Sequence, residues 1–129
     1  MNGRSRLNRV LSQLPPFPRK VLTQVFHLNL GLYFQIHAPD SIWNENGGIF
    51  IFSKRTSNSK WVALFIGETD SFRDDLKHHP QWQQAVSLGA THIHTRAYES
   101  HQDRRIDLQT LIKAYRPALN RLLRDVSHC

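Results

Sequence analysis

Between residues 26 and 36, apolar and polar residues take alternate positions. Successive side chains of a β-strand point to opposite faces, so the alternation from Phe26 to Ile36 predicts an extended strand. Ahead of it, leucine and valine recur at helical spacing over Arg4 to Leu14, and Pro15 ends the short amphipathic helix that this spacing predicts. The beginning of the chain therefore predicts one helix and one strand.

Two apolar runs in the middle of the chain predict a β-hairpin. Gly48 to Phe52 follows an Asn-Gly turn signal and predicts a buried strand, and Trp61 to Ile66 predicts a second strand. The loop between them, Ser53 to Lys60, is rich in turn-forming residues, which favours antiparallel pairing. Further along, Ala90 to Tyr98 predicts a third strand, in which Ile93 points inward between two flanking histidines.

Three helices complete the predicted elements. They run from Thr69 or Asp70 to about His78, from Pro80 to Leu88, and from Ser100 or Asp103 to the residue before Pro117. The order strand, strand, helix, helix, strand, helix is typical of an α/β fold of the α+β sandwich type. We therefore expect a small antiparallel sheet of about three core strands flanked by helices. An extra basic helix and strand in residues 1–42 should pack on the domain formed by residues 43–129.

The composition is that of one ordinary globular domain. The chain has 129 residues, enough for a single core, with a hydrophobic content of 40% and a charged content of 21%. No apolar run is long enough to cross a bilayer and no secretory signal is recognisable, so we expect no membrane association. The single cysteine, Cys129, cannot form an internal disulfide and argues against a cysteine-based zinc site. These features predict a cytoplasmic location.

The charge of the chain indicates a polyanion as partner. The formal net charge is +7 at pH 7, the sequence pI is about 10.2, and the basic residues gather near the two ends. Each phosphate that such a protein neutralises releases condensed counterions, which favours binding. We therefore expect nucleic acid as the partner. The predicted contact residues are Lys54, Arg55, Arg104, Arg105, Lys113 and Arg116.

Several motifs occur together between Trp43 and Asn120. Gly48-Ile49-Phe50 and Phe65-Ile66-Gly67 flank the hairpin loop, His79 follows the helix after the second motif, and Pro117-Ala118-Leu119-Asn120 ends the stretch. In this order and spacing they resemble the GIY-YIG nuclease domain, in which two tyrosines line a metal-dependent DNA-cleaving site. The resemblance implies a GIY-YIG-like fold, and it implies DNA rather than RNA as the nucleic acid.

The resemblance also implies a set of polar catalytic residues, and most of them are replaced in this chain. In the family a tyrosine or an activated water attacks the phosphate, a glutamate holds a divalent cation, and an arginine stabilises the developing charge. Phe50 and Phe65 stand at the two tyrosine positions and have no hydroxyl group. Asp75 stands at the arginine position, and Leu108, which cannot bind a metal, stands at the glutamate position. Only His79 is retained, so the sequence predicts no metal site and no cofactor.

Neighbouring polar residues are the candidates to replace the lost groups. Arg73 precedes the arginine position by two residues, which turns its side chain by roughly 200° around the helix. Asp107 precedes the glutamate position by one residue, roughly 100° away. Glu68 lies next to the hairpin, but one carboxylate does not restore a metal site.

Three functions remain open from the sequence. The first is a degenerate domain that binds nucleic acid without cutting it. The second is an active metal-dependent endonuclease with a rearranged site involving His79, Glu68 and Asp107, which would use Mg²⁺ or Mn²⁺. The third is an interaction module that docks a protein partner along the strand from Phe26 to Ile36.

Overall fold

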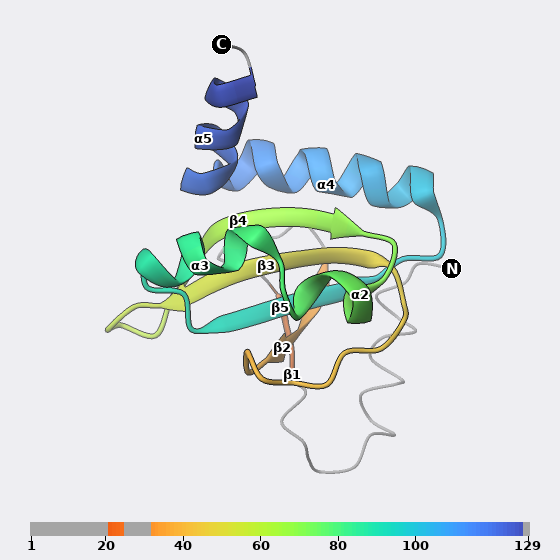
Figure 1. The fold of residues 1–129 in the computed structure, drawn as a ribbon, viewed down its shortest axis with the longest axis horizontal. Coiled ribbons are helices and arrows are strands. Elements are labelled where there is room, and N and C mark those ends of the chain that lie inside the picture. Colours follow the sequence, from red (N-terminus) through yellow and green to blue (C-terminus); the bar gives the residue numbers. More distant parts are fainter. Residues whose placement is uncertain (1–20, 25–31, 128–129) are drawn as a thin grey trace.

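The protein is described by a computed structural model that covers residues 21–24 and 32–127. Five strands in these residues form one antiparallel sheet in the order β1-β2-β5-β3-β4 (Figure 1). The strands are β1 (Val21–Gln24), β2 (Tyr33–His37), β3 (Gly48–Arg55), β4 (Trp61–Thr69) and β5 (His92–Ala97). The predicted α+β class with an antiparallel sheet is confirmed.

Helices cover both faces of the sheet. They are α2 (Phe72–Leu76), α3 (Pro80–Ser87), α4 (His101–Tyr115) and α5 (Ala118–Ser127). Figure 1 shows α4 along one face, α2 and α3 on the other, and α5 beside β4. None of the helices in the described part of the chain has the length and apolar character that a membrane span needs.

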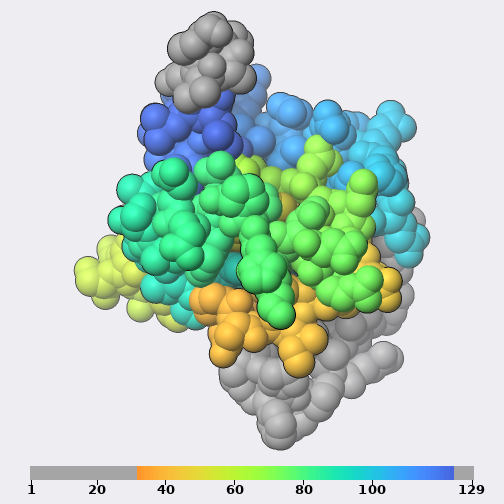
Figure 2. All heavy atoms as spheres, in the orientation of Figure 1, coloured from red at the N-terminus to blue at the C-terminus, as the bar shows by residue number. Residues whose placement is uncertain are grey.

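The central strand β3 has apolar residues on both faces. Ile49 and Ile51 point to the face under α4, whereas Phe50 and Phe52 point to the face under α2 and α3. All four are at most 1% exposed. Figure 2 shows the atoms of α2 and α3 forming the surface over the second face. The continuous apolar run of this strand therefore reflects burial from two sides.

The hairpin strands are longer than predicted and one helix was not predicted. β3 extends to Arg55 and β4 extends to Thr69, whereas α2 already ends at Leu76. The predicted elements end before Pro117, but α5 begins directly after this proline. Arg116 adopts a left-handed backbone conformation with φ of 47°, which ends α4 and turns the chain into α5.

The N-terminal predictions are tested only in part. The helix from Arg4 to Leu14 lies outside the described residues, as does most of the strand from Phe26 to Ile36. The described part of that strand belongs to β2, which pairs with β1 on one side and with β5 on the other. The idea that this strand offers a free edge for a protein partner is therefore wrong for its described part. β1 and β2 also continue the sheet of the following residues across the predicted boundary at residue 42.

The histidines of the sheet are more buried than the sequence pattern indicates. Ile93 is 2% exposed, as predicted, but His94 is completely buried on the opposite face of β5. His37 is also buried, and its Nε2 lies 2.8 Å from the hydroxyl oxygen of Thr95. Both faces of β5 are covered, so alternation between an apolar and a polar face does not apply to it.

Candidate functional site

The two signature motifs lie side by side in the β3–β4 hairpin. Phe50 is paired with Gly67, and Phe52 with Phe65. The ring centroids of Phe50 and Phe65 are 5.9 Å apart, and these side chains are 1% and 7% exposed. A Cβ on Gly67 would lie 2.7 Å from Cζ of Phe50, so the absence of a side chain at Gly67 makes room for the tip of this ring. The two positions that the sequence resemblance assigns to tyrosines are therefore filled by packed rings.

His79 joins this aromatic cluster and caps a helix. Its ring centroid lies 5.1 Å from that of Phe50 and 5.5 Å from those of Phe52 and Phe65. Its Nδ1 accepts a hydrogen bond from the backbone N–H of Gln81 at 3.1 Å, at the N-terminus of α3. The proton of the neutral ring therefore sits on Nε2. Burial lowers the pKa of His79, and the nearby charge of Asp75 opposes this shift.

Asp75 lies in α2, and its side chain contacts the turn that leads from β4 into this helix. Its carboxylate accepts a hydrogen bond from the hydroxyl of Thr69. The same hydroxyl oxygen accepts from the backbone N–H of Ser71 at 3.0 Å, and Ser71 is the N-cap of α2. Asp75, which the sequence resemblance places at the arginine position, thus stabilises this turn with a negatively charged side chain.

Leu108 lies on the other side of the sheet. It projects from α4 into the apolar cluster that contains Ile49, Ile51, Ile66 and Leu111. The structure therefore brings Phe50, Phe65 and His79 together with Asp75 nearby, but it does not place Leu108 with them.

Glu68 and Arg104 form the centre of a polar cluster at the start of α4. The side chain of Arg104 is 9% exposed, and its Nε donates to Glu68 at 2.8 Å. Its two remaining nitrogens donate to the carbonyl oxygen of Thr69 at 2.9 Å and to the carboxylate of Asp70 at 3.0 Å. The second oxygen of Glu68 accepts from Nε of Arg105 at 2.8 Å. Both oxygens of Glu68 are therefore occupied by arginines.

The other candidate replacements are also engaged elsewhere. Asp107 accepts a hydrogen bond from the hydroxyl of Tyr98 at 2.6 Å. Burial and this hydrogen bond raise the pKa of Tyr98 above its ordinary value. Arg73 is exposed and pairs with Glu45 at 3.2 Å. Within residues 32–123, no group of three or more His, Cys, Asp or Glu side chains is arranged to hold a metal ion.

Solved structures that are similar to this chain contain an endonuclease domain. No protein-family model and no curated protein matches the chain. Among solved structures, the chain is similar to the N-terminal GIY-YIG endonuclease domain of UvrC from Thermotoga maritima bound to magnesium. The identity is 25% over 60% of this chain and 85% of that chain, with a TM-score of 0.48. A tyrosine-to-phenylalanine point mutant of that domain, bound to its catalytic divalent cation, gives 26% identity with the same coverage and TM-score.

The fold is similar to that of a GIY-YIG endonuclease domain. The roles of the individual site residues stay predictions.

The sheet carries two of the predicted basic contact residues at the tip of its hairpin. The Arg55 guanidinium lies 5.3 Å from the ring centroid of Trp61, as a cation over an aromatic face. Lys54 is half-buried, and its Cδ would lie 3.3 Å from a Cβ on Gly89. Both cations project from the end of β3 that is opposite to Gly48 of the first signature motif.

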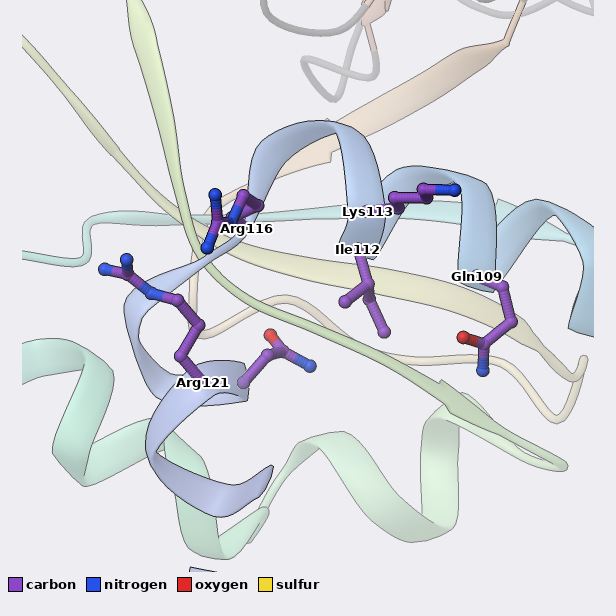
Figure 3. A pocket seen from close by; sticks show the side chains of 6 residues that line it. Gln109, Ile112, Lys113, Arg116 and Arg121 are labelled. Atoms are coloured by element: carbon purple, nitrogen blue, oxygen red, sulfur yellow. The ribbon is translucent and has the colours of Figure 1, made fainter. Parts of the chain in front are cut away.

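A hollow of about 600 Å³ between α4 and α5 collects further basic residues (Figure 3). Its lining consists of Gln109, Ile112, Lys113, Arg116, Asn120 and Arg121. Lys113 and Arg116 were predicted as contact residues from charge alone, but Arg121 was not, because α5 was not predicted. Its sequence signal is the leucine spacing after Pro117, which is typical of a helix.

Asn120 connects this hollow to the second signature strand. Its Oδ1 accepts from the backbone N–H of Ile66, and its Nδ2 donates to the carbonyl oxygen of Ile66, both at 2.8 Å. β4 is an edge strand of the described sheet, so these two hydrogen bonds satisfy backbone groups that no neighbouring strand pairs. The asparagine that ends the family-like motif thereby fixes α5 against β4.

Proposed function

We propose that this protein is a GIY-YIG-like domain that binds DNA in the cytoplasm without cleaving it. One observation supports the proposal most directly. The family's two tyrosine positions are occupied by phenylalanines that are 1% and 7% exposed and packed against each other and against His79. Such rings cannot donate, accept or transfer a proton, so the chemical step has lost its groups while the scaffold is retained.

The remaining polar groups support the same proposal. A general base at His79 would need a free ring nitrogen, but Nδ1 caps α3 and Nε2 carries the proton of the neutral ring. A cation would need carboxylates, but Glu68 is held by two arginines and Asp107 by Tyr98. The net charge of +7 favours a polyanion, so binding is the function for which the chain keeps the required groups.

DNA binding is tested by fluorescence polarisation with a labelled duplex over a series of salt concentrations. We expect retention at low salt and a steep, linear decrease of log K with log salt between about 50 and 200 mM. The same measurement with an RNA duplex of equal sequence should give weaker binding. No retention even at the lowest salt would remove the proposed function.

Cleavage is tested separately with supercoiled plasmid in the presence of Mg²⁺ or Mn²⁺. We expect no nicked product above a no-protein control. If metal-dependent nicking appears and His79→Ala abolishes it, the protein is an active endonuclease with a rearranged site and the proposal is wrong. Nicking that His79→Ala leaves unchanged would point to a co-purified nuclease, which repeated purification of both proteins would then remove.

A further inference from the structure

Three cations from two helices surround the hollow between α4 and α5. Lys113 and Arg116 come from the last turn of α4 and its C-cap, and Arg121 comes from the first turn of α5. Figure 3 shows Arg116 and Arg121 projecting on the same side of the hollow, with Ile112 between the two helices. The hollow thus has a partly apolar floor and a cationic rim.

No described acid neutralises this rim. All three basic side chains are exposed, and none of them forms an ion pair with a described carboxylate. Among the residues that the structure describes, the lining of the hollow includes no Asp or Glu. Cations that converge without an internal counterion raise the local potential and attract an anion from solution.

The position of the hollow is fixed by the fold. The two hydrogen bonds between Asn120 and the backbone of Ile66 hold the start of α5 against the edge of the sheet. Leu119 is 3% exposed within the apolar cluster that also contains Phe65, which anchors the same turn from its other side. The backbone that carries Arg121 is therefore fixed against the sheet, and no rearrangement of α5 is needed for ligand binding.

We propose that this hollow, which we call the α4–α5 phosphate site, binds consecutive backbone phosphates of a DNA strand. The inference rests on the proposed function and names the surface that carries it out. Guanidinium groups match phosphate oxygens with paired hydrogen bonds, and a lysine adds a mobile point charge. A hollow of about 600 Å³ on an open surface accommodates a stretch of sugar-phosphate backbone rather than one isolated ion. The strand would run past the outer edge of β4, next to the second signature motif.

The test compares two doubly substituted proteins that lose the same charge. The site variant is Lys113→Gln/Arg121→Gln, and the matched control is Lys60→Gln/Lys77→Gln, whose two lysines are exposed and lie outside the hollow. Arg116 stays unchanged because its left-handed backbone conformation ends α4. None of the four replaced side chains is buried, so both variants should fold, which thermal unfolding verifies.

We expect the site variant to bind the labelled duplex at least about tenfold more weakly at 100 mM salt. Its slope of log K against log salt should fall by about 1.8, the value for two lost phosphate contacts. The control variant should stay within about twofold, because neither of its two lysines lines the hollow. Equal losses in both variants would overturn the site while leaving DNA binding by the protein intact.

Isothermal titration calorimetry with inorganic pyrophosphate tests whether the hollow binds a DNA backbone or a small phosphorylated ligand. We expect no tight binding of pyrophosphate and only weak competition with the duplex. Pyrophosphate binding that the site variant abolishes, together with duplex binding that it leaves unchanged, would assign the hollow to a small phosphorylated ligand and overturn the proposal. A wild-type protein that binds no duplex at all would instead remove the proposed function itself.

Discussion

The two ends of helix α4 carry similar charge and use it differently. At its start, Arg104 is buried and donates to Glu68, Asp70 and the backbone of Thr69. At its end, Lys113 is exposed and faces a hollow without acids. The difference lies in the acidic partners that neighbouring elements supply, because β4 and the turn after it bring two carboxylates to the first end and none to the second.

The comparison shows that a count of basic residues does not locate a nucleic-acid surface. Arg104 and Lys113 were both predicted to contact DNA from charge alone. The Arg104 guanidinium already uses Nε and both terminal nitrogens within the protein, and moving it outward would leave Glu68 without its buried partner. Arg105 is intermediate, since its side chain is 67% exposed although it pairs with Glu68.

Replacing Arg104 should give the largest effect on stability. Arg104→Leu removes the buried partner of Glu68 and should lower the free energy of unfolding by about 3 kcal/mol in urea titrations. Arg105→Gln, in an exposed pair with the same glutamate, should cost less than about 1 kcal/mol. The folded fraction of Arg104→Leu should bind DNA as the wild type does. If Arg104→Leu is stable but no longer binds DNA, both ends of α4 take part in DNA binding and the contrast between them is wrong.

Replacing Asn120 should have a smaller effect, but one that reaches both stability and binding. Asn120→Ala removes two hydrogen bonds to Ile66 and leaves a backbone N–H and C=O without partners, at a cost of about 2 kcal/mol. Because α5 then loses its attachment to β4, DNA affinity should also decrease. Gln109→Ala, an exposed lining residue, is the control and should change stability by less than about 0.5 kcal/mol. Unchanged affinity in folded Asn120→Ala would show that the hollow does not depend on this attachment.

Most of the elements were predictable because their signals are local. The apolar runs of β3 and β4, the capping residue Ser100 of α4, and Pro80 at the start of α3 each indicate an element without reference to the rest of the chain. The signature motifs could be aligned for the same reason. The predicted cap of α2, Thr69 or Asp70, is wrong, because Ser71 caps this helix. α5 escaped prediction because Pro117 was taken only as the end of a helix, although proline also favours the first turn of the next one.

For the candidate site, the sequence could predict only which chemical groups its residues lack. Phe50, Phe65, Asp75 and Leu108 reveal by their residue types what they cannot do. The sequence could not show that Leu108 lies on the opposite face of the sheet from Phe50, or that Arg104 is buried with two acids. These facts depend on contacts between residues far apart in the chain, which no local pattern contains.

Lowering the pH should reduce the stability of the fold without changing the charge of the lysines and arginines at the two ends of α4. Burial, with smaller contributions from the charges of His92 and His37, lowers the pKa of His94 to about 3. The unfolded chain therefore binds a proton below about pH 6.5 that the folded protein does not, so stability falls as the pH falls from 6.5 toward 3. At about pH 5.5 the loss from His94 should be about 1.3 kcal/mol relative to pH 7, measured by urea unfolding at constant salt.

The control for this pH effect is His94→Gln, which should flatten the dependence without abolishing it. His79 and His92 also have a lowered pKa and contribute in the same direction. Lysine and arginine do not titrate in this range, so the DNA affinity of the folded protein should stay the same between about pH 7 and 5.5. If affinity instead rose at acid pH, protonated histidines would belong to the binding surface. The contrast between the two ends of α4 would then not be sufficient to explain where DNA binds.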